Sequence, residues 1–212
     1  MRRLPVYLVL DTSGSMSGEP IEAVKNGVQV LISTLRQDPY ALETAFISVL
    51  TFNSEARQLI PLTDLSSFQM QEIKASGGTS LGAVLQLLAD CIRREVITST
   101  QDVKGDWKPL IFLMTDGIPT DQWQQGLNAF KNSKTGITVA CAAGNGADVN
   151  LLKQITDTVV SLDTADAAAI KAFFKWVSAS VSTGSQKIES GGKEVAGLNE
   201  LPPPPPEVNI VV

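Results

Sequence analysis

The sequence predicts an α/β fold of the doubly wound kind, with a central, mostly parallel sheet between two layers of helices. Short apolar runs alternate along the chain with longer segments in which apolar residues recur every three or four positions. The short runs are nearly continuous, which is typical of strands covered on both faces. With 212 residues, 43% of them hydrophobic, the chain is long enough for one such domain with a substantial core.

Apolar runs of strand length occur at five places: Val6–Leu10, Ala45–Phe52, Leu110–Met114, Ile137–Ala142 and, more weakly, Thr158–Leu162. Residues 56–65, ARQLIPLTDL, are predicted to add one antiparallel edge strand, because Pro61 has no N–H group to donate to a central ladder.

Helices on both faces of the sheet are predicted from three apolar stripes. The stripes are Ile21, Val24, Val28, Leu31 and Leu35, then Leu81, Val84, Leu85, Leu88, Ile92 and Val96, and finally Ile170, Phe173, Phe174, Val177 and Val181. Trp176 lies on or near the last stripe, so we expect it to pack in the core.

A change of composition after residue 182 predicts a domain of residues 1–182 followed by a tail of residues 183–212. The tail begins with a flexible Gly/Ser-rich stretch and continues with five prolines at 202–206, which predict a stiff polyproline spacer. Its end, EVNIVV, is expected to be disordered, although it could also add a strand to the sheet edge of a partner.

The composition excludes several classes of function. The net charge is −5, without the basic surface that nucleic-acid binding usually requires. The chain contains no histidine, which excludes His-based zinc sites, Ser-His-Asp triads and histidine general bases.

The sequence also predicts a cytoplasmic protein that does not bind a membrane. Cys91 and Cys141 lie in helix and strand patterns without CxxC spacing, which indicates buried thiols in a reducing compartment. No apolar run approaches the roughly 18 residues needed to span a bilayer. The N-terminal MRRLPVYLVLD is interpreted as a buried first strand, because Pro5 and Asp11 interrupt a signal-peptide pattern.

Polar loops occur at three of the places where parallel strands end or helices begin. DTSGS contains Asp11, Ser13 and Ser15; SGGTS contains Thr79 and Ser80; TDG contains Thr115, Asp116 and Gly117. Each loop alone is compatible with an Asx turn, a helix cap or a turn dipeptide. In open α/β sheets, ligands bind outside the carboxyl ends of the strands, which favours a shared site for the three loops.

The side chains of these loops are hard oxygen donors that suit Mg²⁺ or Mn²⁺. A site of hydroxyls, with Asp11 and Asp116 acting through water, leaves the ion under-neutralised. We therefore expect the ion to bind an external anion, most naturally a carboxylate of a partner protein.

The motifs DTSGS, GGTS and LMTDG, in this order, resemble the metal-ion-dependent adhesion site (MIDAS) of von Willebrand factor A (vWA) domains, which have a Rossmann-like fold. The resemblance covers roughly residues 4–182. It implies direct metal ligands at Ser13, Ser15 and, with ligand engaged, Thr79, with Asp11 and Asp116 acting mainly through water. It also implies a protein-interaction module without catalytic activity, in which the loop carrying Thr79 shifts on engagement.

Within this family, the chain resembles the TerY group of small cytoplasmic proteins from bacterial tellurite-resistance operons. The segments that carry this resemblance are RRLPVYLVLDTSGSMSGEPIEAVKNGV, FISVLTFNSEA, ASGGTSLG and WKPLIFLMTDGIPTD. It implies a role as a monomeric adaptor or scaffold in stress resistance, with a protein kinase and a PP2C-type phosphatase as partners.

Gly14, Gly78, Trp107 and Trp123 are further candidates for contacts with a partner. The two tryptophans flank the predicted metal site in the sequence, and they could equally cover the end of the sheet.

Two functions of other classes remain as alternatives. A phosphotransferase of the haloacid-dehalogenase type would also place an aspartate after the first strand, but it needs a second acid where this chain has Ser13. A ribonucleoprotein component is disfavoured by the acidic charge. A serine hydrolase and a dinucleotide-binding domain are disfavoured because the GxSxG and GxGxxG patterns are missing from the first loop.

Overall fold

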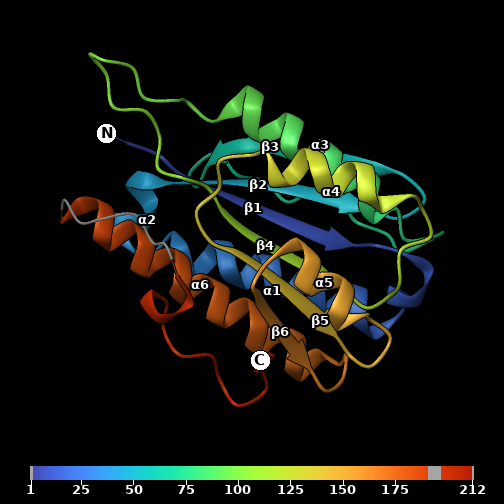
Figure 1. Ribbon diagram of the computed structural model, residues 1–212. Coiled ribbons are helices and arrows are strands. Elements are labelled where there is room, and N and C mark those ends of the chain that lie inside the picture. Colours follow the sequence, from blue (N-terminus) through green and yellow to red (C-terminus); the bar gives the residue numbers. More distant parts are fainter. Residues whose placement is uncertain (1, 191–196, 212) are drawn as a thin grey trace.

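The computed structural model describes residues 2–190 and 197–211 of the chain. Its strands form one seven-stranded sheet in the order β3-β2-β1-β4-β5-β6-β7 (Figure 1). The strands are β1 (Leu4–Asp11), β2 (Ala45–Phe52), β3 (Ala56–Asp64), β4 (Leu110–Thr115), β5 (Thr138–Ala143), β6 (Thr158–Leu162) and β7 (Asn209–Val211). The predicted doubly wound α/β fold is therefore confirmed.

The centre of the sheet is parallel, and both of its edges are antiparallel. Strand β1 pairs in parallel with β2 and β4, and the parallel pairing continues through β5 to β6. The predicted edge strand with Pro61 is β3, which pairs antiparallel with β2. The other edge was not predicted: β7 pairs antiparallel with β6.

Two layers of helices cover the sheet (Figure 1). The helices on one face are α1 (Glu19–Leu35), α2 (Pro39–Thr44) and α6 (Ala167–Glu189), and those on the other are α3 (Leu81–Glu95), α4 (Trp123–Lys131) and α5 (Val149–Ile155). Short 3₁₀ turns occur at η1 (Gly14–Met16) and η2 (Leu198–Glu200). None of the helices in the described part of the chain is long and apolar enough to cross a membrane.

The short helices α2, α4 and α5 were not predicted, because they contain too few turns for a clear apolar period. Local capping contributes to two of them. Asp38 accepts hydrogen bonds from the backbone N–H groups of Tyr40 and Ala41 at the start of α2. Asp148 accepts them from Asn150 and Leu151 at the start of α5.

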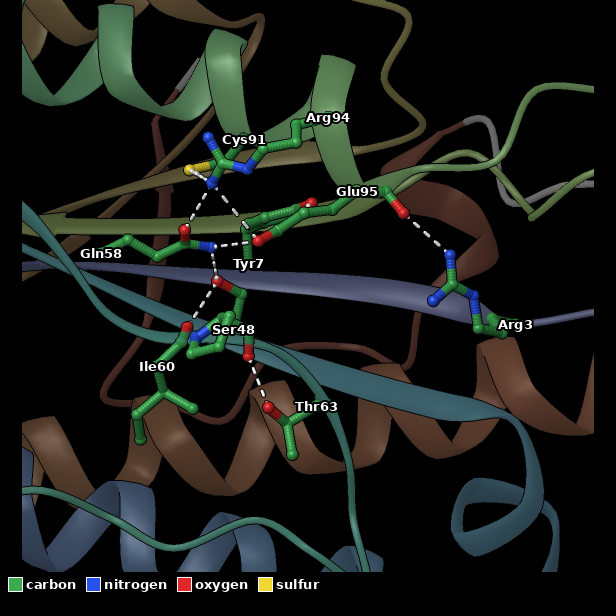
Figure 2. A network of polar contacts seen from close by, with 10 residues as sticks. Arg3, Tyr7, Ser48, Gln58, Ile60, Thr63, Cys91, Arg94 and Glu95 are labelled. Carbon is green, nitrogen blue, oxygen red and sulfur yellow. Dashed lines mark hydrogen bonds and ion pairs between the residues drawn. The ribbon is translucent and has the colours of Figure 1, made fainter.

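A polar network joins the end of α3 to the sheet (Figure 2). Glu95 Oε2 accepts a hydrogen bond from the buried Tyr7 hydroxyl at 3.1 Å, and Glu95 Oε1 accepts one from Gln58 Nε2 at 2.7 Å. The Gln58 amide also donates to Ser48 Oγ, and its oxygen accepts from Arg94. These bonds satisfy polar groups that β1, β2 and β3 place beneath the helix.

The predicted boundary after residue 182 falls inside α6, which continues to Glu189. The described residues that follow, 197–211, are not a free tail. Leu201 and Val208 are only 7% and 3% exposed, and Trp176 Nε1 donates a hydrogen bond to the Pro202 carbonyl at 2.8 Å. We call residues 197–211 the C-terminal strap, because they cross α6 and end in β7. The stretch predicted to be flexible begins at residue 183, inside α6, and its residues 191–196 lie outside the described residues.

Candidate functional site

Asp11 is the last residue of β1, and its side chain lies at the carboxyl edge of the sheet with 1% of its surface exposed. Its Oδ1 accepts a hydrogen bond from Ser13 N at 2.8 Å, and its Oδ2 accepts one from Thr115 Oγ1 at 2.5 Å. Burial raises the pKa of the Asp11 carboxyl, and the hydrogen bonds from Ser13 and Thr115 oppose this effect. The carboxylate is therefore fixed between two of the three predicted loops.

Two serine hydroxyls connect the first loop to Asp116. Ser13 Oγ and Ser15 Oγ are 3.0 Å apart, and Ser15 Oγ donates to Asp116 Oδ1 at 2.7 Å. Ser13 is buried, whereas Ser15 is exposed and Asp116 is half-buried. This row of oxygen atoms thus runs from beneath the surface to the solvent, between the loops after β1 and β4.

Thr79 enters the same region from the loop before α3. A Cβ atom built on Gly117 would lie 3.4 Å from Thr79 Oγ1 and 4.0 Å from Ser15 Oγ. Both hydroxyls therefore border Gly117, at ordinary contact distance from a Cβ atom at that position. The Thr79 backbone is fixed on both sides, because its N–H donates to Thr120 Oγ1 and its carbonyl accepts from Thr120 N, each at 2.9 Å.

Glycines allow the first and second loops to touch through their backbones. Gly14 N donates to Gly77 O at 2.9 Å, and a Cβ atom on Gly14 would lie only 3.3 Å from that oxygen. Gly77 has φ +73°, a conformation that favours glycine. Gly78 N donates to Ser54 Oγ at 2.9 Å. Gly14 and Gly78 thus hold the loops in place, whereas their contact with a partner stays a prediction.

The sequence analysis missed three residues that support the site. Thr115 was noted in its loop but not as the donor to Asp11. Thr120 fixes the Thr79 backbone, and Asp121 accepts hydrogen bonds from Gly82 N and Ala83 N at the start of α3. TDGIPTD contains Thr and Asp, which are common capping residues, but this signal does not show that they bind the segment that begins α3 instead of the helix that follows them.

The two tryptophans occupy different ends of the molecule. Trp107 precedes β4, its backbone N–H donates to Arg3 O at 2.9 Å, and the Arg2 guanidinium lies 4.5 Å from the centre of its ring. The length of β4 separates Trp107 from Asp116, so of the two roles left open for Trp107 its position fits covering the end of the sheet, whereas a contact with a partner stays a prediction. Trp123 is half-buried at the start of α4, two residues after Asp121.

The donor set of this site consists mainly of hydroxyls. Among the described residues, no group of three or more His, Cys, Asp or Glu side chains could hold a metal ion. The described ion pairs likewise include none with Asp11, so its buried carboxylate has hydrogen-bond donors but no cation beside it.

Comparisons with known proteins agree with the fold. The family model of the von Willebrand factor type A domain matches residues 6–175. A protein of Synechocystis sp. is 34% identical over 123 residues, which are 55% of this chain and 26% of that protein. A von Willebrand factor A domain-containing protein of Dictyostelium discoideum is 25% identical over 148 residues, 68% of this chain and 15% of that protein. The matched regions thus span about a quarter or less of these relatives.

Solved structures with a similar fold include a von Willebrand factor type A protein from Catenulispora acidiphila, with a TM-score of 0.64, 19% identity and coverage of 86% of this chain and 43% of that one. The pilus adhesin SpaC of Lactobacillus rhamnosus GG has a TM-score of 0.68, 15% identity and coverage of 86% and 30%. Proximal thread matrix protein 1 from the mussel byssus, solved with a zinc-occupied MIDAS motif, has a TM-score of 0.62, 18% identity and coverage of 84% and 48%.

These structural identities are low, so the likeness to the solved structures establishes the fold alone. The family model, in contrast, matches well over half of the sequence and includes residues 6–11 of β1 and all of β4, which carry the site. The chain belongs to the von Willebrand factor type A domain family.

Proposed function

We propose that the site is a MIDAS that binds a divalent metal ion and, through it, an acidic side chain of a partner protein. The observation that carries this proposal is a row of side-chain oxygens: Ser15 Oγ lies 3.0 Å from Ser13 Oγ and 2.7 Å from Asp116 Oδ1. The Thr79 hydroxyl joins this group, because it borders Gly117, as the Ser15 hydroxyl does. Adjacent ligands of an octahedral Mg²⁺ ion lie about 2.9 Å apart, since its bonds to oxygen are about 2.0–2.1 Å long. The 3.0 Å between Ser13 Oγ and Ser15 Oγ, the two hydroxyls with a measured separation among the proposed direct ligands, therefore suits a small, hard cation.

The environment of Asp11 supports a cation as well. A carboxylate that is 1% exposed loses most of its hydration, and the two hydrogen bonds that it accepts replace only part of it. A positive ion near the serine hydroxyls would offset the remaining cost. Hydroxyl and carboxylate oxygens are typical donors for Mg²⁺ or Mn²⁺, which are the ions that we propose.

Each residue of the site would have a distinct task. Ser13, Ser15 and Thr79 would hold the ion directly, and Asp11 and Asp116 would neutralise part of its charge through water. When bound, the ion supplies an open coordination position for a carboxylate oxygen. The loop contact from Gly14 to Gly77 keeps the first and second loops together, and Ser15 and Asp116 face the solvent from which a partner would arrive.

The site is better suited to binding than to phosphoryl transfer. A nucleophilic aspartate must present a free oxygen to the substrate, but both oxygens of Asp11 accept hydrogen bonds and its side chain is buried. Position 13, where the haloacid-dehalogenase mechanism needs an acid, carries a serine. We therefore propose a module without catalytic activity of its own.

The resemblance to TerY extends the proposal to a biological role. In this extended proposal, the chain is a monomeric cytoplasmic adaptor in tellurite or stress resistance, and its partners are a protein kinase and a PP2C-type phosphatase. The two free, buried cysteines, Cys91 and Cys141, fit a reducing compartment.

Metal titration tests the site itself. We expect Mn²⁺ or Mg²⁺ to bind the full chain in isothermal titration calorimetry, and Asp116→Ala to weaken binding at least about tenfold. Asp102→Ala removes an exposed carboxylate before β4, at the other end of the sheet, and should leave the affinity unchanged. Equal metal binding by Asp116→Ala and the unaltered chain would refute the site, provided that circular dichroism shows both folded.

Affinity capture tests the partner. The tagged chain is incubated with native lysate in Mg²⁺ or in EDTA, and bound proteins are identified by mass spectrometry. We expect a kinase and a PP2C-type phosphatase to be retained only in Mg²⁺ and lost with Asp116→Ala. If proteins of other kinds are retained only in Mg²⁺ and lost with Asp116→Ala, the result supports a metal-dependent interaction module and refutes the kinase–phosphatase role.

A further inference from the structure

The five prolines of the C-terminal strap have a regular backbone that follows from the sequence. Each residue from Leu201 to Pro205 precedes a proline, which pushes its ψ into the extended range, and each proline ring holds φ near −65°. Leu201 has φ −89° and ψ 159°, and the described residues contain no cis peptide bond. Residues 201–205 therefore form a polyproline II helix with three residues per turn.

This helix is held against the domain at both ends. Leu201 and Val208 are buried, and the Pro202 carbonyl accepts the hydrogen bond from Trp176 Nε1. A turn closes the other end, where Val208 N donates to Pro205 O at 2.9 Å, and β7 follows directly. The conformational entropy that a free proline segment would lose on binding has thus already been lost on folding.

Exposure along the prolines follows the three-residue period. Pro203 and Pro206 are exposed, whereas Pro202, Pro204 and Pro205 are half-buried. Pro206 directly follows the helix, and the ψ of Pro205 and its own fixed φ set the place of its ring. Because Pro203 lies three residues earlier, the two rings lie along the same edge, where both residues are exposed. An arrangement in which two prolines separated by two residues project from one edge is the form in which PxxP segments are recognised.

The edge with Pro203 borders a groove against α6. The groove has a volume of about 450 Å³ and is lined on one side by α6 and on the other by Pro202, Pro203 and Pro205. Lys171 and Lys175, one helical turn apart and both exposed, contribute two positive charges to it, against one negative charge from Glu207. The surface beside the prolines is therefore apolar with a net positive charge.

We propose that the prolines are a preformed ligand for a second protein, one with an aromatic-lined groove that has acidic residues at its rim. Pro203 and Pro206 enter the aromatic groove, and Lys171 and Lys175 face the acidic rim. This interaction uses a different surface from the metal site and needs no metal. It would let the chain contact two proteins at once, which goes beyond the proposed function of the metal site.

The test is a titration of the full chain with a purified SH3 domain that carries acidic residues beside its aromatic groove, in EDTA so that the metal site makes no contribution. We expect a Kd below about 1 mM by calorimetry. Pro203→Ala/Pro206→Ala should weaken binding at least about tenfold, as expected for the loss of central contacts. Lys171→Glu/Lys175→Glu should weaken binding of the SH3 domain as well, and salt should then lower the affinity less than it does for the unaltered chain.

Pro204→Ala is the matched control, because it makes the same chemical change at a half-buried position between the two exposed rings. It should change the Kd less than about threefold, within the range of near-neutral contacts. Trp176 fluorescence reports in each variant whether the strap stays docked. Absence of binding at about 1 mM would overturn the proposal, and so would equal weakening by Pro204→Ala and by the double variant with the strap docked.

Discussion

Tyr7 is a polar side chain at the centre of the sheet, and its hydroxyl depends on a single partner among the described contacts, Glu95 Oε2 (Figure 2). The side chain is fully buried. Loss of hydration and the nearby negative charge of Glu95 raise the pKa of Tyr7 well above its ordinary value. The folded protein therefore keeps Tyr7 protonated at a pH where the unfolded chain would ionise it.

Tyr7→Phe should lower the free energy of unfolding by about 1 kcal/mol at pH 8, because Glu95 loses one hydrogen-bond donor. Because the pKa of Tyr7 is higher in the folded than in the unfolded protein, the stabilisation by its protonated hydroxyl is fully present below the unfolded pKa of about 10. Above that pH the unfolded chain ionises Tyr7 first, so this stabilisation declines. The unaltered chain should thus lose up to about 1.4 kcal/mol per pH unit above pH 10 from Tyr7, and the phenylalanine variant should not.

Urea unfolding at pH 8 and pH 11 measures this difference. We expect the two proteins to differ at pH 8 and to converge at pH 11. Tyr40→Phe is the control, because Tyr40 is 45% exposed and should show no such convergence. A difference that is constant with pH would contradict the assigned role of Tyr7.

Single residues of the site could be predicted where they follow a strand directly. Asp11 ends β1 and Asp116 follows β4, so the parallel sheet brings them to one edge. Thr120 could not be assigned its role, because its contact with Thr79 depends on how α4 approaches α3. The sequence left the role of Trp107 open, because proximity in sequence to Asp116 does not show which end of β4 a residue occupies.

At the scale of elements, α3 and α4 approach each other at two glycines. A Cβ atom built on Gly126 would lie 1.9 Å from the carbonyl oxygen of Gly82, which belongs to the backbone and cannot rotate away. Thr120 and Asp121 lie just before α4 and bind the segment that begins α3. The glycine contact therefore helps to set the position of Thr79.

Gly126→Ala should lower the free energy of unfolding by about 1–3 kcal/mol through overpacking. Alanine has a higher helix propensity than glycine by up to about 1 kcal/mol, which would raise the free energy of unfolding. The sign of the measured change therefore shows whether the clash or the helix propensity prevails. We expect the steric effect to prevail, because a backbone atom must move. Urea unfolding gives the free energy, and a variant as stable as the unaltered chain would contradict the close approach.

The neighbouring change Gln125→Ala provides the control for this experiment. Gln125 is exposed on the same helix, so its replacement by alanine gives only a small gain in helix propensity and lacks the clash. It should leave the stability within about 0.5 kcal/mol of the unaltered chain.

The elements that could be predicted are the long ones. The helices α1 and α3 and the five central strands were located within a few residues, because each buries a continuous face. The start of α6 was located as well, but the helix continues to Glu189, past the predicted boundary after residue 182. The seven-residue α5 has too few turns for a stripe, and the three-residue β7 is stabilised by pairing with β6. Such contacts between distant segments leave no local pattern.

On the scale of the whole molecule, the C-terminal strap returns the end of the described chain to the sheet. Its composition suggested a solvated tail, because proline and polar residues dominate it and only two of its apolar side chains, Leu201 and Val208, are buried. These two anchors, the Trp176 hydrogen bond and the pairing of β7 are each modest in energy. Together they must exceed the entropy lost by ordering the strap.

This balance predicts how substitutions in the strap combine. Leu201→Ala and Val208→Ala should each cost about 1–3 kcal/mol. The double variant should cost clearly less than the sum, because the first change already favours release of the strap and the second removes a contact that is then partly lost. The loss of unfolding free energy in the double variant cannot exceed the net free energy with which the strap docks, since we expect the rest of the domain to stay folded when the strap is released.

Urea unfolding of both single variants and the double variant tests this prediction, with Ile210→Ala as a control because Ile210 is 48% exposed. Trp176 fluorescence should shift to the red as the strap leaves, since its indole N–H loses Pro202. The Mn²⁺ affinity should not change, because the strap pairs with β6 whereas the site lies at β1 and β4. Full additivity of the two costs would instead mean that residues 197–211 fold as an inseparable part of the core.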